Sequence, residues 1–169
     1  MHKATVIKRL RREQPRTTLE LLDVCGLPLQ LLDWGQFRSV YDVLGTGLVI
    51  KVPNQESKGF MTKINIGHSR EEYRAWKKIK SSRYQYRELK TYLPDIIYFN
   101  SRSGITVMPK YGPVKWPRGR SRYKAMEDME SLFTNALQIS DADIKEANLG
   151  SDRNGNIKIL DLGLLSGSV

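Results

Sequence analysis

The sequence has little of what a disulfide framework or a soft-ligand metal site needs. It contains one cysteine, Cys25, and two histidines among its 169 residues. A single cysteine excludes an internal disulfide and a cysteine-rich zinc site. No stretch approaches the roughly 18 apolar residues of a transmembrane helix, and the first residues turn charged too early for a secretory signal. We therefore expect a cytoplasmic protein without membrane association, in which Cys25 is a buried structural thiol.

Acidic residues are scarce over most of the chain. Residues 1–124 hold 25 lysines and arginines against 10 aspartates and glutamates, a net charge of +15. Residues 125–169 hold 3 against 8, a net charge of −5. Such a basic body favours anionic partners, and the candidates are nucleotide phosphates, an acidic protein or other anionic macromolecule, and nucleic acid.

The first half of the chain predicts helices followed by a hairpin. Residues 1–30 are predicted to be a basic helical extension, in which Thr17 caps a short helix that ends at Gly26. Residues 37–44 and 48–52 are rich in β-formers and are joined by a glycine-rich turn. This pattern predicts two antiparallel strands.

The second half predicts alternating helices and strands. Residues 69–80 have an apolar stripe of helical period, and Ser69 with Glu72 has the spacing of a capping box at the start of this helix. The elements expected next are two strands and a helix, over residues 93–99, 105–108 and 125–137. Asn154-Gly155 then predicts a type I′ turn before a strand at 156–160.

Polar residues near the end of the chain carry the chemistry. Asp143, Lys145 and Asn148 place a carboxylate, an amine and a carboxamide within six residues, and Asp161 ends the following strand. Asn and Asp supply hard oxygen ligands of the kind that Mg²⁺ prefers, and a second Asp can accept a proton from a hydroxyl nucleophile. Lys51, at the end of an apolar strand, would be costly to bury without an anion. Together these residues indicate phosphoryl transfer.

These segments resemble motifs of the protein-kinase-like superfamily, in the family's order, over about residues 33–165. Asp143-Ile-Lys-Glu-Ala-Asn148 resembles the D-[LI]-K-x-x-N catalytic loop, and Val49-Ile50-Lys51 resembles the V-A-I-K strand. Asp161-Leu-Gly163 resembles D-F-G. Glu72, or alternatively Glu71, matches the helix glutamate that pairs with the lysine. Val107-Met108-Pro109-Lys110-Tyr111 resembles the hinge that lines the adenine pocket.

The resemblance implies a role for each matching residue. Lys51 would hold the α- and β-phosphates and pair with Glu72, Asp143 would be the catalytic base, and Lys145 would steady the transferred phosphate. Asn148 and Asp161 would hold the metal ions. The remaining nucleotide-binding residues implied are Gly35, Met108, Lys110 and Tyr111.

The fold that the resemblance implies is an α+β protein-kinase-like fold. Residues 31–169 would form a minimal kinase-like domain. Its N-lobe, about 31–111, would be a five-stranded antiparallel sheet with one helix, and its abbreviated C-lobe would be about 112–169. The implied function is that of a small atypical kinase, similar to compact microbial or phage kinase-like proteins. Such an enzyme uses ATP and Mg²⁺ to transfer the γ-phosphate to a hydroxyl of its substrate.

Three departures from the family pattern keep two alternatives open. The glycine-rich loop aligns with residues 33–38, where only Gly35 remains; Asp141-Ala142 replaces the usual His-Arg; and six residues follow Gly163, so we expect no activation segment. The first alternative is a pseudokinase-like binding module that regulates or inhibits a macromolecular partner. The second is a basic nucleic-acid-binding factor on a kinase-like scaffold. Tyr111, Trp116 and Tyr123, interleaved with basic residues over 110–124, fit the second, although we favour a solvated charge run as the explanation of that segment.

Overall fold

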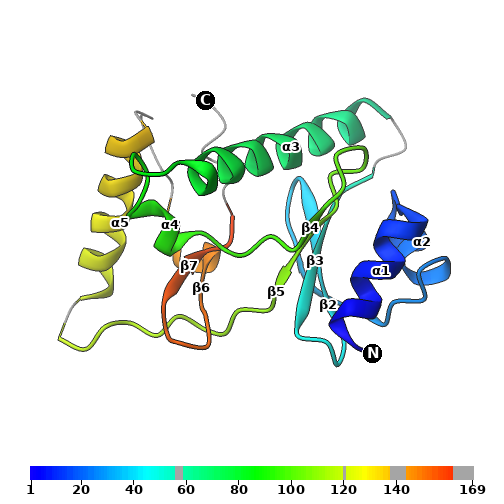
Figure 1. The fold of residues 1–169 in the computed structure, drawn as a ribbon, viewed down its shortest axis with the longest axis horizontal. Coiled ribbons are helices and arrows are strands. Elements are labelled where there is room, and N and C mark those ends of the chain that lie inside the picture. The colour runs from blue at the N-terminus through cyan, green and yellow to red at the C-terminus, as the bar shows by residue number, and fades with distance from the viewer. Residues whose placement is uncertain (56–58, 120, 138–143, 162–169) are drawn as a thin grey trace. The chain divides into compact units, whose positions relative to one another are not determined.

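The computed structural model describes residues 1–55, 59–119, 121–137 and 144–161. Contacts divide the chain into two compact units (Figure 1), the first made of residues 1–70 and 95–110 and the second of residues 71–94 and 111–169. The α+β class is confirmed, as is the five-stranded antiparallel sheet. Within the described ranges, no helix is long and apolar enough to cross a membrane.

The first unit is built on this five-stranded sheet. Its strands lie in the order β1-β2-β3-β5-β4, and every neighbouring pair is antiparallel. Their bounds are β1 Leu29–Trp34, β2 Arg38–Val43, β3 Leu48–Pro53, β4 Tyr98–Phe99 and β5 Thr106–Pro109. The hairpin predicted at 37–44 and 48–52 is confirmed as β2 and β3. Its register places Val40 opposite Lys51.

The strand expected over 93–99 is much shorter in the structure. Only Tyr98 and Phe99 belong to the ladder, as β4. Leu93, 1% exposed, packs instead in the core of the second unit. Pro94 follows it and has no N–H to donate to a neighbouring strand.

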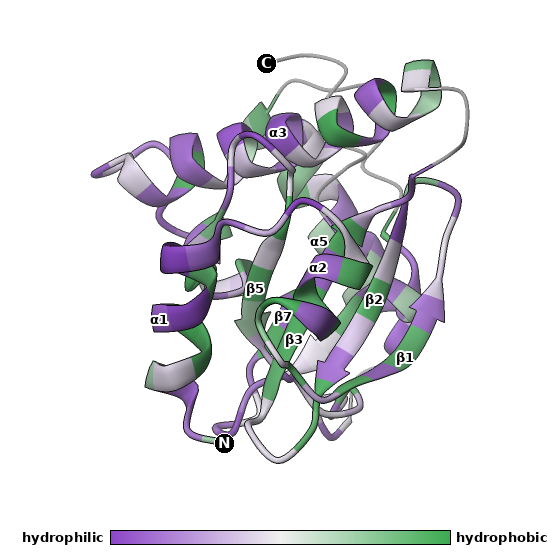
Figure 2. Cartoon of the chain, turned by 90° about the vertical axis from the view of Figure 1, so that its right-hand side faces the viewer, coloured by the Kyte–Doolittle hydropathy of each residue, from purple (hydrophilic) through white to green (hydrophobic). Residues whose placement is uncertain are grey.

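Two N-terminal helices cover one face of the sheet. They are α1 Lys3–Glu13 and α2 Thr18–Asp23, and both lie on one side of β2 and β3 (Figure 2). The Thr17 hydroxyl accepts the Glu20 N–H at 3.0 Å, which confirms the predicted cap. Residues 1–30, expected to be an extension, share a core with the sheet. Its members include Val6, Leu10, Leu21, Cys25, Leu48, Ile50 and Val52, each at most 2% exposed.

The long helix α3 spans Gly59–Ser81, so it begins ten residues before the predicted start. The capping box at Ser69 is therefore wrong. The Ser69 hydroxyl donates to the Asn65 carbonyl at 3.3 Å inside the helix. Between Gly59 and the predicted start at Ser69, the buried positions are Asn65 and Ser69 itself. These two residues lie on the buried face of the helix but are polar. Apolar residues therefore do not recur there at helical spacing, and the sequence pattern does not reveal the helix.

The second unit contains helices and a small hairpin around its own core. Its elements, besides the end of α3, are α4 Leu89–Tyr92, α5 Arg122–Leu137, η1 Glu146–Asn148, β6 Leu149–Ser151 and β7 Ile157–Ile159. The helix predicted at 125–137 is confirmed as α5, with one extra turn at its start. Its buried face, centred on Phe133 at 0% exposed, packs with Ile79, Leu89 and Leu149.

Candidate functional site

Lys51 lies on β3 and is 6% exposed. Its neighbours Ile50 and Val52 belong to the core beneath α1 and α2. Because successive side chains of a strand point to opposite faces, Lys51 points to the other face of the sheet. Met108 is opposite Val49 in the register, so it lies on the same face as Lys51, and it is 3% exposed. The first unit thus presents the predicted phosphate-binding lysine and a predicted hinge residue on one sheet face.

Lys110 is held in the sheet by both its backbone and its side chain. Its N–H donates to the Gly47 carbonyl at 2.9 Å. Its ammonium pairs with the Asp42 carboxylate at 2.5 Å, and Asp42 is 8% exposed. With the N–H engaged by the neighbouring strand, only the carbonyl of Lys110 is left for the predicted contact with adenine.

The turn between β1 and β2 contains Gly35, the predicted phosphate-loop glycine. The Gly35 N–H donates to the Arg38 carbonyl at 3.0 Å, and the preceding Trp34 N–H donates to the Asp33 carboxylate at 2.8 Å. Both donors therefore have an acceptor inside the turn. A phosphate oxygen bound there would have to replace these acceptors. Trp34 itself is 75% exposed.

Asn54, directly after β3, fixes the conformation of this turn. Its amide nitrogen donates to the carbonyls of Gly35 at 2.7 Å and Gln36 at 3.2 Å. Its amide oxygen accepts the Ser39 hydroxyl at 2.8 Å, and its N–H donates to the Phe37 carbonyl at 2.9 Å. Asn54 was not among the predicted site residues. The one signal available was an Asn immediately after the proline that ends a strand.

A cavity of about 450 Å³ lies beside the same turn. Its lining includes Trp34 and Gly35 together with Thr17 and Thr18 at the start of α2. It also includes Ser39, which is opposite the core residue Val52 in the register. The cavity is therefore on the side of the sheet that α2 covers, and Lys51 points to the opposite side.

Of the two candidate glutamates on α3, Glu72 is the buried one, at 4% exposed, whereas Glu71 is exposed. Burying a carboxylate is costly unless it is paired or hydrogen-bonded. The burial therefore favours Glu72 over Glu71 as the partner of a cation. Lys51 and Glu72 belong to different units, so their pairing stays a prediction.

The second unit brings the two predicted metal ligands together. Asn148 immediately precedes β6, and Asp161 follows β7 by two residues. The Leu160 N–H donates to the Asn148 carbonyl at 2.7 Å, which continues the ladder beyond the Leu149–Ile159 pair. Asn148 and Asp161 therefore lie at the same end of the hairpin, and both are half-buried.

Only part of the predicted catalytic loop is described. Lys145 is exposed and its carbonyl accepts the Asn148 N–H at 2.9 Å, which closes the η1 turn. Asp143, the predicted base, lies outside the described residues. Among the residues that are described, no group of three or more His, Cys, Asp or Glu side chains could hold a metal ion. Two oxygen donors, Asn148 and Asp161, suit Mg²⁺ that takes its other ligands from water and phosphate.

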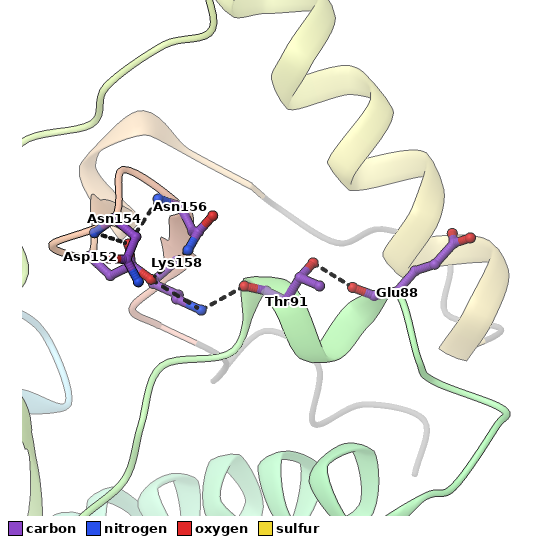
Figure 3. A network of polar contacts seen from close by, with 6 residues as sticks. All are labelled: Glu88, Thr91, Asp152, Asn154, Asn156 and Lys158. Carbon is purple, nitrogen blue, oxygen red and sulfur yellow. Dashed lines mark hydrogen bonds and ion pairs between the residues drawn. The ribbon is translucent and has the colours of Figure 1, made fainter.

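A polar network holds the hairpin that lies between the predicted ligands Asn148 and Asp161 (Figure 3). The Asp152 carboxylate accepts the N–H groups of Asn154 and Asn156, each at 2.9 Å, and the Asn156 side-chain amide, also at 2.9 Å. The hydrogen bonds from Asn156 and Asn154 lower the pKa of Asp152 below its ordinary value. The Lys158 ammonium, on β7, donates to the Thr91 carbonyl at the end of α4 at 2.7 Å. The strand leading to Asp161 is thus tied to a neighbouring helix.

The predicted type I′ turn at Asn154-Gly155 is wrong, although the hairpin itself is present. Gly155 has φ +85°, but Asn154 does not have a positive φ, and a type I′ turn needs both. Five residues, 152–156, separate β6 from β7. The carboxylate of Asp152 organises this longer loop, which is a common use of Asp at the start of a turn.

Tyr111, the last predicted hinge residue, packs against β6. A Cβ atom at Gly150 would lie 2.8 Å from the Tyr111 Cβ and 3.2 Å from the Gly112 carbonyl. The next residue, Gly112, exchanges two backbone hydrogen bonds with Ser151, at 3.0 and 2.9 Å. Gly150 therefore lets the chain after the predicted hinge pass close to the strand that begins beside Asn148.

The connector at 110–124 does not present a row of free aromatic rings. Val114 and Trp116 pack against the core of the second unit. Tyr123 is 67% exposed, with the Arg122 guanidinium 5.1 Å from its ring centroid. Two of the three aromatic residues predicted to stack bases, Tyr111 and Trp116, are therefore used in packing.

Comparison with known proteins does not assign this chain to a family. No model of a known protein family matches it, and a search of curated proteins finds no match.

Proposed function

We propose that the chain binds ATP with Mg²⁺ and transfers the γ-phosphoryl group to a hydroxyl, as a small atypical kinase-like phosphotransferase. The observation that carries the proposal is the position of Asn148 and Asp161 at one end of the β6–β7 hairpin, joined by the Leu160 hydrogen bond to the Asn148 carbonyl. A carboxamide and a carboxylate so placed can bind Mg²⁺ that also contacts phosphate oxygens.

The first unit supports the same proposal through Lys51. A lysine that is 6% exposed on a strand is costly unless an anion compensates its charge. In the proposed function this lysine contacts the α- and β-phosphates and is oriented by Glu72. Met108, on the same sheet face, would lie beside the adenine, and the backbone of Lys110 and Tyr111 would hydrogen-bond to it.

In the proposed reaction, each of the predicted catalytic and metal-binding side chains of the second unit has a separate role. The oxygen of the acceptor hydroxyl attacks the γ-phosphorus while Asp143 takes its proton, and the bond to the β,γ-bridging oxygen breaks to release ADP. Lys145 stabilises charge on the transferred group. Bound Mg²⁺ would neutralise charge on the phosphates, with Asn148 and Asp161 as its protein ligands.

ATP turnover tests the proposed chemistry without a known substrate. With γ-phosphate-labelled ATP and Mg²⁺, we expect release of phosphate to water or labelling of the protein itself. Asp143→Ala should reduce this turnover by about 100-fold or more, the usual contribution of a general base, while ATP binding is retained. Glu146→Ala removes a half-exposed carboxylate from the same loop, and its turnover should stay within about three-fold of wild type because exposed ion pairs contribute little. Equal turnover in wild type and Asp143→Ala would contradict the assigned role.

The β1–β2 turn favours a second candidate, a pseudokinase-like module that binds a partner without phosphoryl transfer. The Trp34 and Gly35 N–H groups are engaged inside the turn, and the Asp33 carboxylate places negative charge there. If the chain is such a module, the wild-type protein should bind nucleotide or a partner. Its ATP turnover should then be no higher than that of Asp143→Ala. Asp33→Asn separates the two further. If the turn contacts phosphate, removing this charge should tighten ATP binding by roughly three- to ten-fold.

A further inference from the structure

The outer side of α3 within the second unit carries a row of cations. Arg74, Lys77 and Lys78 are exposed, while Ala75 and Ile79 on the opposite side are buried. The spacing i, i+3, i+4 puts these three cations on one helix face, within about 6 Å along the axis. Their side chains form no hydrogen bond or ion pair with another described residue. Their charge is therefore available to a partner.

The segment directly after α3 carries two further cations and an aromatic ring. Arg83 and Arg87 are exposed, and between them Tyr84 is 86% exposed. This turn is well anchored. Tyr86, two residues on, is 5% exposed in the core, and the Arg87 N–H donates to the Tyr84 carbonyl at 3.2 Å. The anchored turn thus keeps the Tyr84 ring exposed to solvent. Arg83 precedes this tyrosine in the sequence and Arg87 follows it three residues later.

We propose that this surface, the basic ridge (Arg74, Lys77, Lys78, Arg83 and Arg87, with Tyr84), binds single-stranded nucleic acid. Residues 73–90 contain seven lysines and arginines and one acidic residue, Glu88. An acidic protein would satisfy the cations equally but gives no reason for the exposed ring. Nucleic acid uses both features, because its phosphates pair with cations and its bases stack on aromatic side chains. In the remainder of the second unit, residues 111–124 carry a net charge of +5 and residues 125–169 a net charge of −5. The net positive charge of this unit therefore comes from the segment that carries the ridge.

Fluorescence anisotropy with a labelled 20-nucleotide oligo(dT) or oligo(U) tests the proposal directly. Five phosphate contacts on a single strand predict a slope of about −3.5 for log K against log salt concentration. The affinity should therefore fall roughly 100-fold between 50 and 200 mM salt. The triple variant Arg74→Gln, Lys77→Gln, Lys78→Gln should reduce the magnitude of the slope by about 2.

The matched control removes the same charge elsewhere. Lys3→Gln, Lys8→Gln, Arg11→Gln neutralises three exposed cations of α1, so it lowers the net charge equally. Its slope should change by less than about 1. If the two triple variants weaken binding equally, affinity follows net charge alone and the ridge is not the site. Because the substituted residues are all exposed, both variants should keep the wild-type melting temperature. If the ridge triple variant does not, the single variant Lys77→Gln is used in its place for the binding measurement.

Tyr84 separates nucleic acid from an acidic protein. Tyr84→Ala should weaken oligo(dT) binding by at least about five-fold through lost stacking, whereas Tyr84→Phe keeps the ring and the affinity. Tyr123→Ala removes another exposed ring of the same unit and should leave binding unchanged. Unchanged affinity in Tyr84→Ala, or equal competition by a poly-glutamate peptide of matching charge, would overturn the proposal. None of these variants alters a residue proposed to bind ATP, so a failure here is distinct from a failure of the phosphotransferase proposal.

Discussion

Asn54→Ala is predicted to loosen the β1–β2 turn, which the proposed function places near phosphate. The substitution removes three side-chain hydrogen bonds, two donated to the Gly35 and Gln36 carbonyls and one accepted from the Ser39 hydroxyl. Each such bond contributes about 1 kcal/mol net, and less where water can replace the partner. Because the turn is exposed, we expect the free energy of unfolding to fall by about 1–2 kcal/mol. For a chain of this length, that corresponds to a melting temperature lower by roughly 3–6 °C.

Urea unfolding and amide hydrogen exchange measure the two parts of this prediction. The unfolding free energy should fall as stated, and exchange should accelerate at the Gly35 N–H, which donates within the turn. Gln55→Ala is the matched control. It removes one exposed hydrogen bond, from the Gln55 amide to the Arg16 carbonyl, and should cost less than about 0.5 kcal/mol. If Asn54→Ala costs no more than Gln55→Ala and exchange at Gly35 is unchanged, Asn54 does not fix the turn.

Three further predictions concern other parts of the structure. Gly104 has φ +72°, and a Cβ there would lie 2.9 Å from the Pro53 Cγ. Gly104→Ala should therefore lower the unfolding free energy by about 2–4 kcal/mol. A loss below about 1 kcal/mol in urea unfolding would refute the close packing. Because the pKa of Asp152 is lowered in the folded state, its contribution is complete above the ordinary pKa of aspartate and is lost as the pH falls through the lowered value. An acid titration followed by NMR should therefore show hairpin amides losing protection in wild type, and little pH dependence in Asp152→Asn. Burial raises the pKa of the Cys25 thiol, so iodoacetamide should label it far more slowly in native protein than in urea; equal rates would contradict its burial.

Local chemistry made much of the first unit predictable from the sequence. The β2–β3 hairpin follows from β-branched residues around a glycine-rich turn. The start of helix α2 could be predicted because a Thr before a helix commonly caps it. The Thr17 hydroxyl does so by accepting the Glu20 N–H. The burial of Cys25, also predicted, reflects the apolar character of its neighbours in the core.

Two of the errors arose where polar residues perform a structural role. Asn65 and Ser69 occupy buried positions of α3, so the apolar pattern placed its start ten residues late. A five-residue loop is found where a type I′ turn was expected. The Asp152 carboxylate stabilises this longer loop by accepting the backbone N–H groups of Asn154 and Asn156. Such hydrogen bonds depend on three-dimensional partners, which hydrophobic periodicity does not encode.

The candidate site was predictable to a different extent in each unit. The resemblance assigned a metal-binding role to both Asn148 and Asp161, and the structure places these two residues at the same end of the β6–β7 hairpin. The burial of Lys51 was foreseen from its apolar strand. In contrast, nothing in the sequence separated Glu72 from Glu71 by burial, and Asn54 gave only a weak turn signal. The pairing of Lys51 with Glu72 stays a prediction.

The most direct test of the account is the melting temperature with and without ATP and Mg²⁺, in wild type, Asp161→Ala and Glu127→Ala. Glu127 is an exposed acid on α5 and controls for the loss of a carboxylate. Ligand at about 100 times its dissociation constant adds roughly 2.7 kcal/mol to stability. We expect a Mg²⁺-dependent upward shift of several degrees in wild type and in Glu127→Ala, and loss of this shift in Asp161→Ala. Absence of any shift at millimolar ATP, or an equal shift in Asp161→Ala, would contradict the proposed nucleotide site.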